Sequence, residues 1–312
     1  MRFRILIRYL SNKLLGMQFL IFAITYPFIW LLSLLPMRLL YVLSDMFYFL
    51  FYYIIRYRKE VVLDNLKLAF PEKELSELKI IRKKFFKHFT DLFVESIKSF
   101  TISEKQISKR YKYINPELIN ELHKKGRSIA FVGSHQANWE WSISIPLVVD
   151  IQCFGAYTRI GNKYFDKTVK DSRMKFGFIG YKTTETVKAM ARNFDNGVQG
   201  LYLLLSDQSP QVHKTHYWSE FMGVKVPIHT GAEMLAKKFD MAVVNYTVKK
   251  VKRGFFEVTF ETITENPKGF KDYEITDKYL EIAERNIYDQ PEYYLWSHKR
   301  FKHRNKVPKE WQ

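Results

Sequence analysis

The sequence predicts an α/β fold: a mixed sheet flanked by helices, with a membrane-anchoring helix at the amino terminus. Short apolar runs at residues 129–132 and 201–205 each end in a polar loop, which is typical of buried parallel strands. Segments with apolar residues at helical spacing lie before, between and after these runs. The chain has 312 residues, of which 47% are hydrophobic, so it can bury one large core or two small ones.

The amino-terminal segment is the first apolar element. Leu14 to Met37 contains no Asp, Glu, Lys or Arg. As a helix it would reach about 36 Å, enough to cross a bilayer core of roughly 30 Å. Arg2, Arg4, Arg8 and Lys13 precede it and favour a cytoplasmic amino terminus by the positive-inside rule. The run is too long for the apolar region of a cleaved signal peptide.

A second apolar stretch, from Leu39 to Ile55, is interrupted by Asp45 and followed by Arg56, Arg58 and Lys59. If this stretch re-enters the membrane or lies in the interface, both basic clusters stay on the cytoplasmic side. A core helix of the globular part is the alternative. We therefore expect an anchor in residues 1–58, with a transmembrane helix at about 14–37, and one further domain in residues 59–312.

The remaining chain predicts an alternation of helices and strands. Residues 60–100 are helical with a break at Pro71, and residues 101–127 form a polar helical connector. The expected strands that follow are 129–132, 152–157, 201–205, 241–249 and 254–263. One helix is expected to begin at residue 139, and four further helices are expected at 163–175, 185–194, 230–239 and 273–286.

The net charge of the chain indicates which classes of molecule it can attract. The 50 Lys and Arg against 32 Asp and Glu give a formal net charge of +18, which predicts attraction to nucleic acid, anionic lipid or an acidic protein. The aromatic and basic stretch 296–302 would suit single-stranded nucleic acid, but the apolar segments favour a membrane surface instead. The single cysteine, Cys153, excludes an intrachain disulfide. His213 and His216 lack the Cys or His-Glu-x-x-His partners of a zinc site, so we expect no metal.

The loop after residue 132 carries the candidate chemistry. The strand would deliver His135 at its carboxyl end, where open α/β sheets hold their sites, and Asn138 would cap a helix that begins at Trp139. Glu140, in the first helical turn, would then converge with His135. In this hypothesis Glu140 holds one imidazole nitrogen while the other accepts a proton from a substrate hydroxyl. The sequence has no Gly-x-Ser-x-Gly elbow of a serine hydrolase.

The string from His135 to Glu140 resembles the His-x4-Asp/Glu motif of glycerolipid-type acyltransferases. In its longer form, His-Gln-Ala-Asn-Trp-Glu, it resembles the late acyltransferases of lipid A biosynthesis, the lauroyl/myristoyl transferase family. Gln136-Ala137 stands where many members have Phe-Gly, which bears on loop shape and chain-length preference. Four further stretches match in the same order, within residues 15–304: Asn65-Leu66 with Phe70-Pro71, Arg159 with Asn162 and Arg173, Asp207-Gln208-Ser-Pro210 with Phe221-Met-Gly223, and Pro291 to Lys302.

The resemblance implies an acyltransferase-type fold with residues 59–312 as the catalytic domain. It also implies a reaction: a fatty acyl chain moves from acyl carrier protein, an acidic donor, to a hydroxyl of a lipid A precursor, without a cofactor. The site would face the cytoplasm at the bacterial inner membrane. His135 and Glu140 would be the catalytic pair. The residues expected to bind substrate are Asn138, Arg159, Asn162, Arg173, Asp207, Gln208, Arg300 and Lys302.

These residue roles have alternatives. Guanidinium groups bind phosphate and oxyanion oxygens well, so Arg159 and Arg173 would hold acceptor phosphates or the developing oxyanion, unless they form structural ion pairs. Arg300 would hold a phosphate, as would Lys302. Asp207 and Gln208 would position polar acceptor groups or stabilise their own loop. Two other functions stay open: a sibling acyltransferase acting on another membrane glycolipid or aminolipid, and a non-catalytic membrane-surface binding protein.

Overall fold

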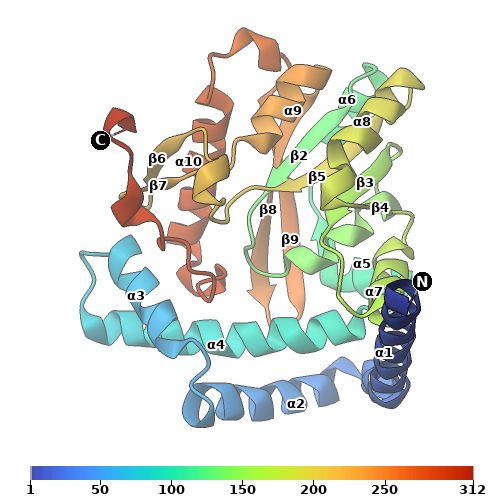
Figure 1. Cartoon of the computed structure of the whole chain (residues 1–312). Coiled ribbons are helices and arrows are strands. Elements are labelled where there is room, and N and C mark those ends of the chain that lie inside the picture. Colours follow the sequence, from blue (N-terminus) through green and yellow to red (C-terminus); the bar gives the residue numbers. More distant parts are fainter. Residues whose placement is uncertain (1, 312) are drawn as a thin grey trace.

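Among the residues that the structure describes, seven strands form a central sheet in the order β1-β9-β8-β2-β5-β3-β4 (Figure 1). The computed structural model describes residues 2–311, with side chains from residue 16 onward. β8 and β9 form an antiparallel hairpin, and the other neighbours are parallel. The strands are β1 (Tyr111–Tyr113), β2 (Ile129–Gly133), β3 (Gln152–Tyr157), β4 (Ile179–Lys182), β5 (Gly200–Leu205), β8 (Ala242–Lys252) and β9 (Phe255–Thr264). The predicted α/β fold is confirmed.

The pairing of β2 with β5 sets the functional edge of the sheet. The two strands run parallel, in a register that aligns Ile129 with Leu201 and Gly133 with Leu205. Their carboxyl ends therefore meet at the same edge. His135 and Asp207, each two residues beyond its strand, start from aligned positions.

Helices cover the sheet, and most lie where the sequence predicts them. The helix predicted from Trp139 is a 3-10 helix, η2 (Trp139–Leu147), capped by the Asn138 side chain, which accepts a hydrogen bond from the Trp141 N–H. The other helices around the sheet are α5 (Glu104–Arg110), α6 (Glu117–Lys124), α7 (Lys163–Met174), α8 (Thr186–Asp195), α9 (Gly231–Phe239) and α10 (Glu274–Asp289).

Four short strands were not predicted from the sequence. β1 lies inside the segment predicted to be wholly a helical connector, which is a correction. β4, and the two-stranded pair β6 (Trp218–Phe221) and β7 (Val224–Pro227), are equally brief. Runs of three or four residues are too short to give a recognisable alternation, so their pairing depends on tertiary contacts.

α4 (Leu75–Lys98) lies between the sheet and the amino-terminal helices (Figure 1). It follows α3 (Lys59–Ala69) after the predicted break at Pro71. Glu74 and Glu77 form a reciprocal capping box that satisfies backbone donors at its start. Along its buried side α4 carries polar residues as well as apolar ones, and these polar groups contact other elements: His88, Asp91, Glu95 and Lys98.

α2 (Met37–Phe49) packs along α4 and continues as one π-helical turn, Leu50–Ile54 (Figure 1). Its buried residues, Met37, Leu40, Ser44 and Tyr48, recur at helical spacing. The opposite face is apolar and exposed, and it carries Leu39, Val42, Met46 and Phe49. An exposed apolar stripe of this length indicates an interaction surface rather than an ordinary solvated face.

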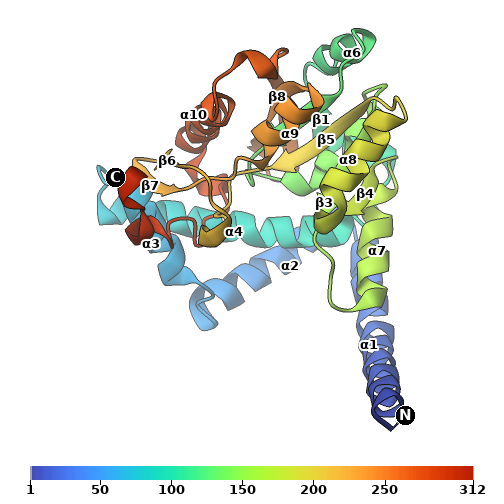
Figure 2. The ribbon, with the colours of Figure 1, turned by 45° about the horizontal axis from the view of Figure 1, so that its top comes forward.

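α1 (Arg2–Leu34) projects from the body beside α7 (Figure 2). The Gln18 amide donates to the Gly161 carbonyl at 3.2 Å, and the Gln18 carbonyl accepts from Asn162 at 2.8 Å. Phe22 stacks on Tyr164 with ring centroids 5.7 Å apart. By length and composition, both the described part of α1 from Gly16 and the segment Met37–Ile54 suffice to cross a membrane.

Candidate active site

His135 lies in the loop after β2 and is held by the loop after β5. Its Nδ1 is 2.7 Å from Oδ1 of Asp207, and its backbone N–H donates to Oδ2 of the same carboxylate at 3.1 Å. The Asp207 side chain is 1% exposed and that of His135 16%. The Gln208 side-chain amide lies 3.2 Å from Nε2 of His135. Because an amide N–H donates and a carboxylate accepts, the neutral imidazole carries its proton on Nδ1 and presents a basic Nε2.

The structure differs from the predicted pairing of Glu140 with His135. Nδ1 is occupied by Asp207, and Nε2 faces Gln208. Glu140 instead accepts two hydrogen bonds from Arg173 Nη2, at 3.1 and 2.9 Å. The local spacing of His135 and Glu140 does bring them into the same site, but the parallel register of β2 and β5 gives Asp207 the closer contact.

The charges around His135 favour its protonated form. Burial lowers its pKa, but the Asp207 carboxylate, through its charge and hydrogen bond, and then Glu140 outweigh burial and hold the pKa above the usual value. For Asp207, burial raises the pKa, while the charge and hydrogen bonds of His135 bring it below the usual value. The pair therefore suits a base that must accept a proton and keep it briefly.

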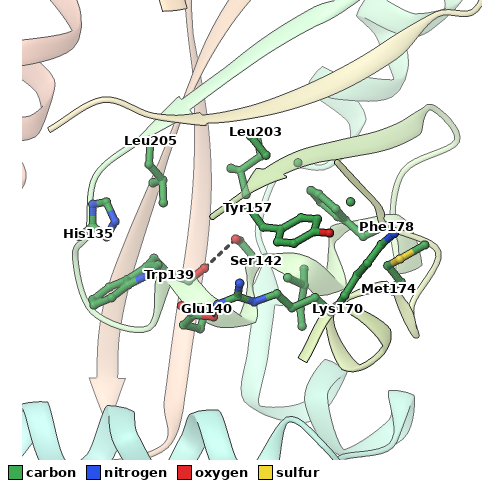
Figure 3. A pocket seen from close by; sticks show the side chains of 15 residues that line it. His135, Trp139, Glu140, Ser142, Tyr157, Lys170, Met174, Phe178, Leu203 and Leu205 are labelled. Atoms are coloured by element: carbon green, nitrogen blue, oxygen red, sulfur yellow. Dashed lines mark hydrogen bonds and ion pairs between the residues drawn. The ribbon is translucent and has the colours of Figure 1, made fainter. Parts of the chain in front are cut away.

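An apolar pocket of about 160 Å³ opens beside His135 (Figure 3). His135 and Trp139 lie at one end, and Tyr157, Phe178 and Met174 lie at the other. Leu203 and Leu205 of β5 and Ile143 of η2 contribute further apolar walls, while Glu140, Lys170 and Arg173 are charged groups at its margin. Gly155 is needed for this shape, since a Cβ there would come within 2.4 Å of the Phe178 ring.

The comparison with known families decides the class of this site. Residues 10–303 match the family model of the bacterial lipid A biosynthesis acyltransferases, which covers nearly the whole chain. The chain belongs to this family. The comparison with curated proteins gave no match. The family is membrane-associated in bacteria, so the chain is an acyltransferase of lipid A biosynthesis in a membrane-associated family.

Three predicted substrate-binding residues of this acyltransferase do not line the pocket. Asn138 is fully buried, and its amide group donates to Glu95 at 2.7 Å. Asn162 caps α7 through the Tyr164 and Phe165 N–H groups and holds Gln18 of α1. Arg159 is exposed and makes no hydrogen bond or ion pair with a described side chain.

The two predicted carboxyl-terminal cations lie apart from the pocket. Arg300 is 1% exposed, stacks over Phe221 at 4.7 Å and donates to the Pro227 carbonyl at 3.1 Å. Its Nε and Nη2 are buried without a hydrogen-bond partner. Lys302 is exposed and lines a separate groove with Lys67, Lys299 and Arg304. Phosphate binding by either residue stays a prediction.

The carboxyl-terminal stretch contacts the loops that carry His135 and Asp207. The Leu295 N–H donates to the His135 carbonyl at 3.1 Å, and the Ala137 N–H donates to the Tyr293 carbonyl at 2.9 Å. His298 accepts from the Ser209 N–H at 3.1 Å. Burial, mainly, lowers the pKa of His298 to about 4, so this imidazole is neutral at physiological pH. These contacts give the stretch from Pro291 to Lys302 a structural role beside His135.

Two buried residues of α4 contact the His135 loop, although neither was a predicted site residue and His88 was expected only to pack within its helical region. His88 donates through Nε2 to the Ala137 carbonyl at 3.1 Å, and Lys250 lies 3.3 Å from its Nδ1. Glu95 accepts the Asn138 amide described above. Ala137 adopts a left-handed conformation, φ 49°, which favours the glycine that the motif resemblance leads us to expect there. The only sequence signal was the position of both α4 residues on the buried side of a charged helix.

No group of three His, Cys, Asp or Glu side chains in residues 16–311 is arranged to hold a metal ion.

Proposed function

We propose that this acyltransferase moves a fatty acyl chain from the thioester of acyl carrier protein to a hydroxyl group of a lipid A precursor. The observation that carries the proposal is the His135–Asp207 pair beside an apolar pocket. An oriented base next to a compartment for a hydrocarbon chain suits a hydroxyl acceptor and an acyl donor. The family description supplies the lipid A context.

In this proposal His135 Nε2 removes the proton of the acceptor hydroxyl as its oxygen attacks the thioester carbonyl. The hydroxyl takes the place of the Gln208 amide at Nε2. Asp207 holds Nδ1–H and stabilises the imidazolium. The new C–O bond forms, the C–S bond breaks, and His135 returns the proton to the departing thiolate. No acyl-enzyme is required.

Glu140 and Arg173 act together in the proposed reaction. The carboxylate fixes the guanidinium at the pocket margin, where it can face the developing oxyanion or an acceptor phosphate. The negative charge of Glu140 also favours the protonated form of His135. Glu140 thus supports the catalytic pair, while Asp207 makes the orienting contact.

The apolar pocket is the proposed site of the acyl chain. Its walls are mainly aliphatic and aromatic, and its opening adjoins the base. The donor would be attracted by the net charge of +18, because acyl carrier proteins are acidic. The acceptor would approach along the margin that carries Arg173, with Arg159 a further candidate for its phosphates.

We infer that residues 1–58 anchor the catalytic domain, residues 59–312, to the inner membrane. In this arrangement α1 enters the bilayer, and α2 lies in the interface with Leu39, Val42, Met46 and Phe49 towards the acyl chains. Two observations support it: α2 keeps its other face against α4, and the outward face bears no charge at these positions.

We infer that the active site faces the cytoplasm, where carrier-bound acyl thioesters are made. Because α2 packs on α4, a full crossing by α1 would leave the amino terminus on the opposite side of the membrane. This departs from the cytoplasmic amino terminus that the first arginines predict. Labelling of Phe3→Cys in intact cells by an impermeant maleimide would support a full crossing. Protection there, with labelling after lysis, would instead put α1 in the cytoplasmic leaflet.

The proposed reaction is tested with membrane fractions, acylated carrier protein and a tetra-acylated lipid A precursor. Wild-type protein should add the mass of one acyl chain to the precursor, and His135→Ala should not. If neither protein adds mass, the lipid A acceptor is wrong, and other membrane glycolipids and aminolipids become the acceptors to screen. If both add mass equally, His135 is not the base.

A further inference from the structure

A buried carboxylate contacts the loop that carries His135 but does not line the pocket. Glu95, on α4, is fully buried. Its Oε2 accepts from the Asn138 amide at 2.7 Å, and its Oε1 accepts from the Tyr41 hydroxyl at 2.8 Å. One side chain thus joins the loop that carries His135 to α2.

The loop side of this connection fixes the start of η2. Asn138 uses its amide nitrogen for Glu95 and its Oδ1 for the Trp141 N–H, at 3.1 Å. The Trp141 indole N–H is 3.3 Å from the Glu95 carbonyl and 3.1 Å from Ser99 Oγ. Glu140, whose carboxylate holds Arg173, lies in this first turn. A displacement of Asn138 would therefore move the charged margin of the pocket.

The α2 side of the connection is also built from polar contacts, some buried and some partly exposed. Ser44 of α2 donates to Asp91 of α4 at 2.9 Å. Arg253, in the β8–β9 turn, binds both Asp91 at 2.6 Å and Asp45 of α2 at 2.7 Å. Gly254 is required beside it, because a Cβ there would come within 2.0 Å of the Tyr41 hydroxyl. These contacts hold α2 to α4 in one alignment.

The charges near Glu95 come from α4 and the hairpin. Burial raises the pKa of Glu95 to about 7, Lys250 opposes this rise, and Asp91 adds to it. An amide at this position would therefore resemble the protonated carboxyl group in charge and shape. Its oxygen can still accept from Asn138 while its nitrogen donates to the Tyr41 hydroxyl.

We propose that Glu95 is a positioning residue of the transfer reaction, which sets the catalytic loop through Asn138 and ties that loop through Tyr41 to the membrane-facing helix α2. The proposal rests on the transfer function proposed above. It assigns Glu95 no contact with substrate. Its effect is on the placement of η2, and hence of Glu140 and Arg173 relative to His135.

The experiment compares full-length wild type with Glu95→Ala, Glu95→Gln and Tyr41→Phe. Glu233→Ala is the matched control, because Glu233 is also a buried glutamate, 4% exposed, but its carboxylate binds Thr276 and the Tyr273 N–H away from the loop. Two quantities are measured: steady-state kcat and KM for acyl transfer, and amide hydrogen exchange of residues 134–142.

For Glu95→Ala we expect kcat to fall by about 100-fold, with KM for the thioester changed by less than about 3-fold, since misplacement of reacting groups acts on the transition state. Exchange at 134–142 should rise. Glu95→Gln should restore most of kcat, and Tyr41→Phe should lie between them. Glu233→Ala should leave exchange at 134–142 unchanged, whatever its effect on stability.

The proposal is overturned if Glu95→Ala keeps kcat near the wild-type value, or if its exchange rises no more in the loop than Glu233→Ala produces. The exchange measurement needs no substrate. If wild type transfers no acyl chain, the proposed function fails by itself, and unchanged loop exchange in Glu95→Ala would then reject the positioning role separately.

Discussion

Asp207 and Glu140 are the two carboxylates next to His135, and they differ in burial, partner and origin. Asp207 is buried, comes from a loop 72 residues away along the chain, and binds the imidazole and the backbone N–H of His135. Glu140 is five residues from His135, is 29% exposed, and binds Arg173. The residue nearer in sequence thus faces the pocket margin, and the distant one binds the imidazole of the proposed base.

Glu140 and Asp207 differ because the first is placed by a short loop before a helix and the second by a pair of parallel strands. A short loop that leads into a helix lets Glu140 approach His135 but leaves its carboxylate on the open side. A parallel strand pair aligns the first residues of two loops at one edge, on the buried side. Local spacing therefore identifies the site, while sheet register identifies the orienting acid.

The largest effect is expected where both carboxylates act, at His135. His135→Ala should lower kcat by about 1,000-fold, in the range of general acid–base catalysis. The measurement is single-turnover acyl transfer with purified protein. Circular dichroism is the control, because removal of the imidazole leaves the Asp207 carboxylate buried with its backbone donor. A folded variant with unchanged turnover would contradict the role of His135.

Asp207→Asn should have the next largest effect and lower kcat by about 100-fold, because the amide cannot replace the charge that stabilises the imidazolium. The carboxylate is also what holds the pKa of His135 above its usual value. A neutral base is active only above its pKa, so the acid limb of kcat/KM should move to lower pH in the variant. A limb that stays in place, or moves to higher pH, would mean that Asp207 does not set the titration of His135.

Glu140→Gln and Arg173→Gln should each reduce kcat/KM by about 10-fold, less than the Asp207 variant, because the pair is partly exposed and acts at the pocket margin. The double variant should lose little more than either single one, since the two side chains work as a unit. Fully additive losses would show that they act independently. If Glu140→Gln lost more activity than Asp207→Asn, Glu140 and not Asp207 would be the carboxylate on which His135 depends more.

A substitution in the pocket wall is expected to change the choice of acyl chain and not the chemistry of transfer. A Cβ at Gly180 would lie 3.4 Å from the Tyr157 ring, an ordinary contact, so a larger side chain can enter the cavity there. Gly180→Val should disfavour the longest accepted donor relative to shorter ones by about 10-fold per excess methylene. Competition between acylated carrier proteins of different chain length, read by product mass, measures this. An unchanged product distribution would remove the pocket from chain selection.

The sequence allowed most of the fold to be predicted, because long periodic segments leave a strong signal. β3 was expected at 152–157 and occurs there, and α7 differs from the expected 163–175 by one residue. β1 and β4 were missed because such short strands owe their pairing to their neighbours. The interface between α2 and α4 is held by scattered polar residues such as Ser44 and Asp91, which form no motif.

For the site, the sequence indicated His135, Glu140, Asp207 and Gln208 as candidates, and the structure gathers all four. It paired His135 with Glu140 and not with Asp207, because the register of β2 against β5 cannot be read from either strand alone. Glu95 could not be found either, since a glutamate in a charged helix resembles a solvated one until burial is known.

β5 lies between β2 and β3 in the sheet although both precede it in the chain. During synthesis, His135 leaves the ribosome while the strand that brings its acid has yet to be made. Parallel pairing between distant segments is slow, so β5 must insert into the middle of a partly formed sheet. Until β5 is in place, the pocket lacks the wall that Leu203 and Leu205 supply, and His135 lacks its Asp207 partner. In the proposed reaction, insertion of this central strand would therefore complete the base and the pocket wall together.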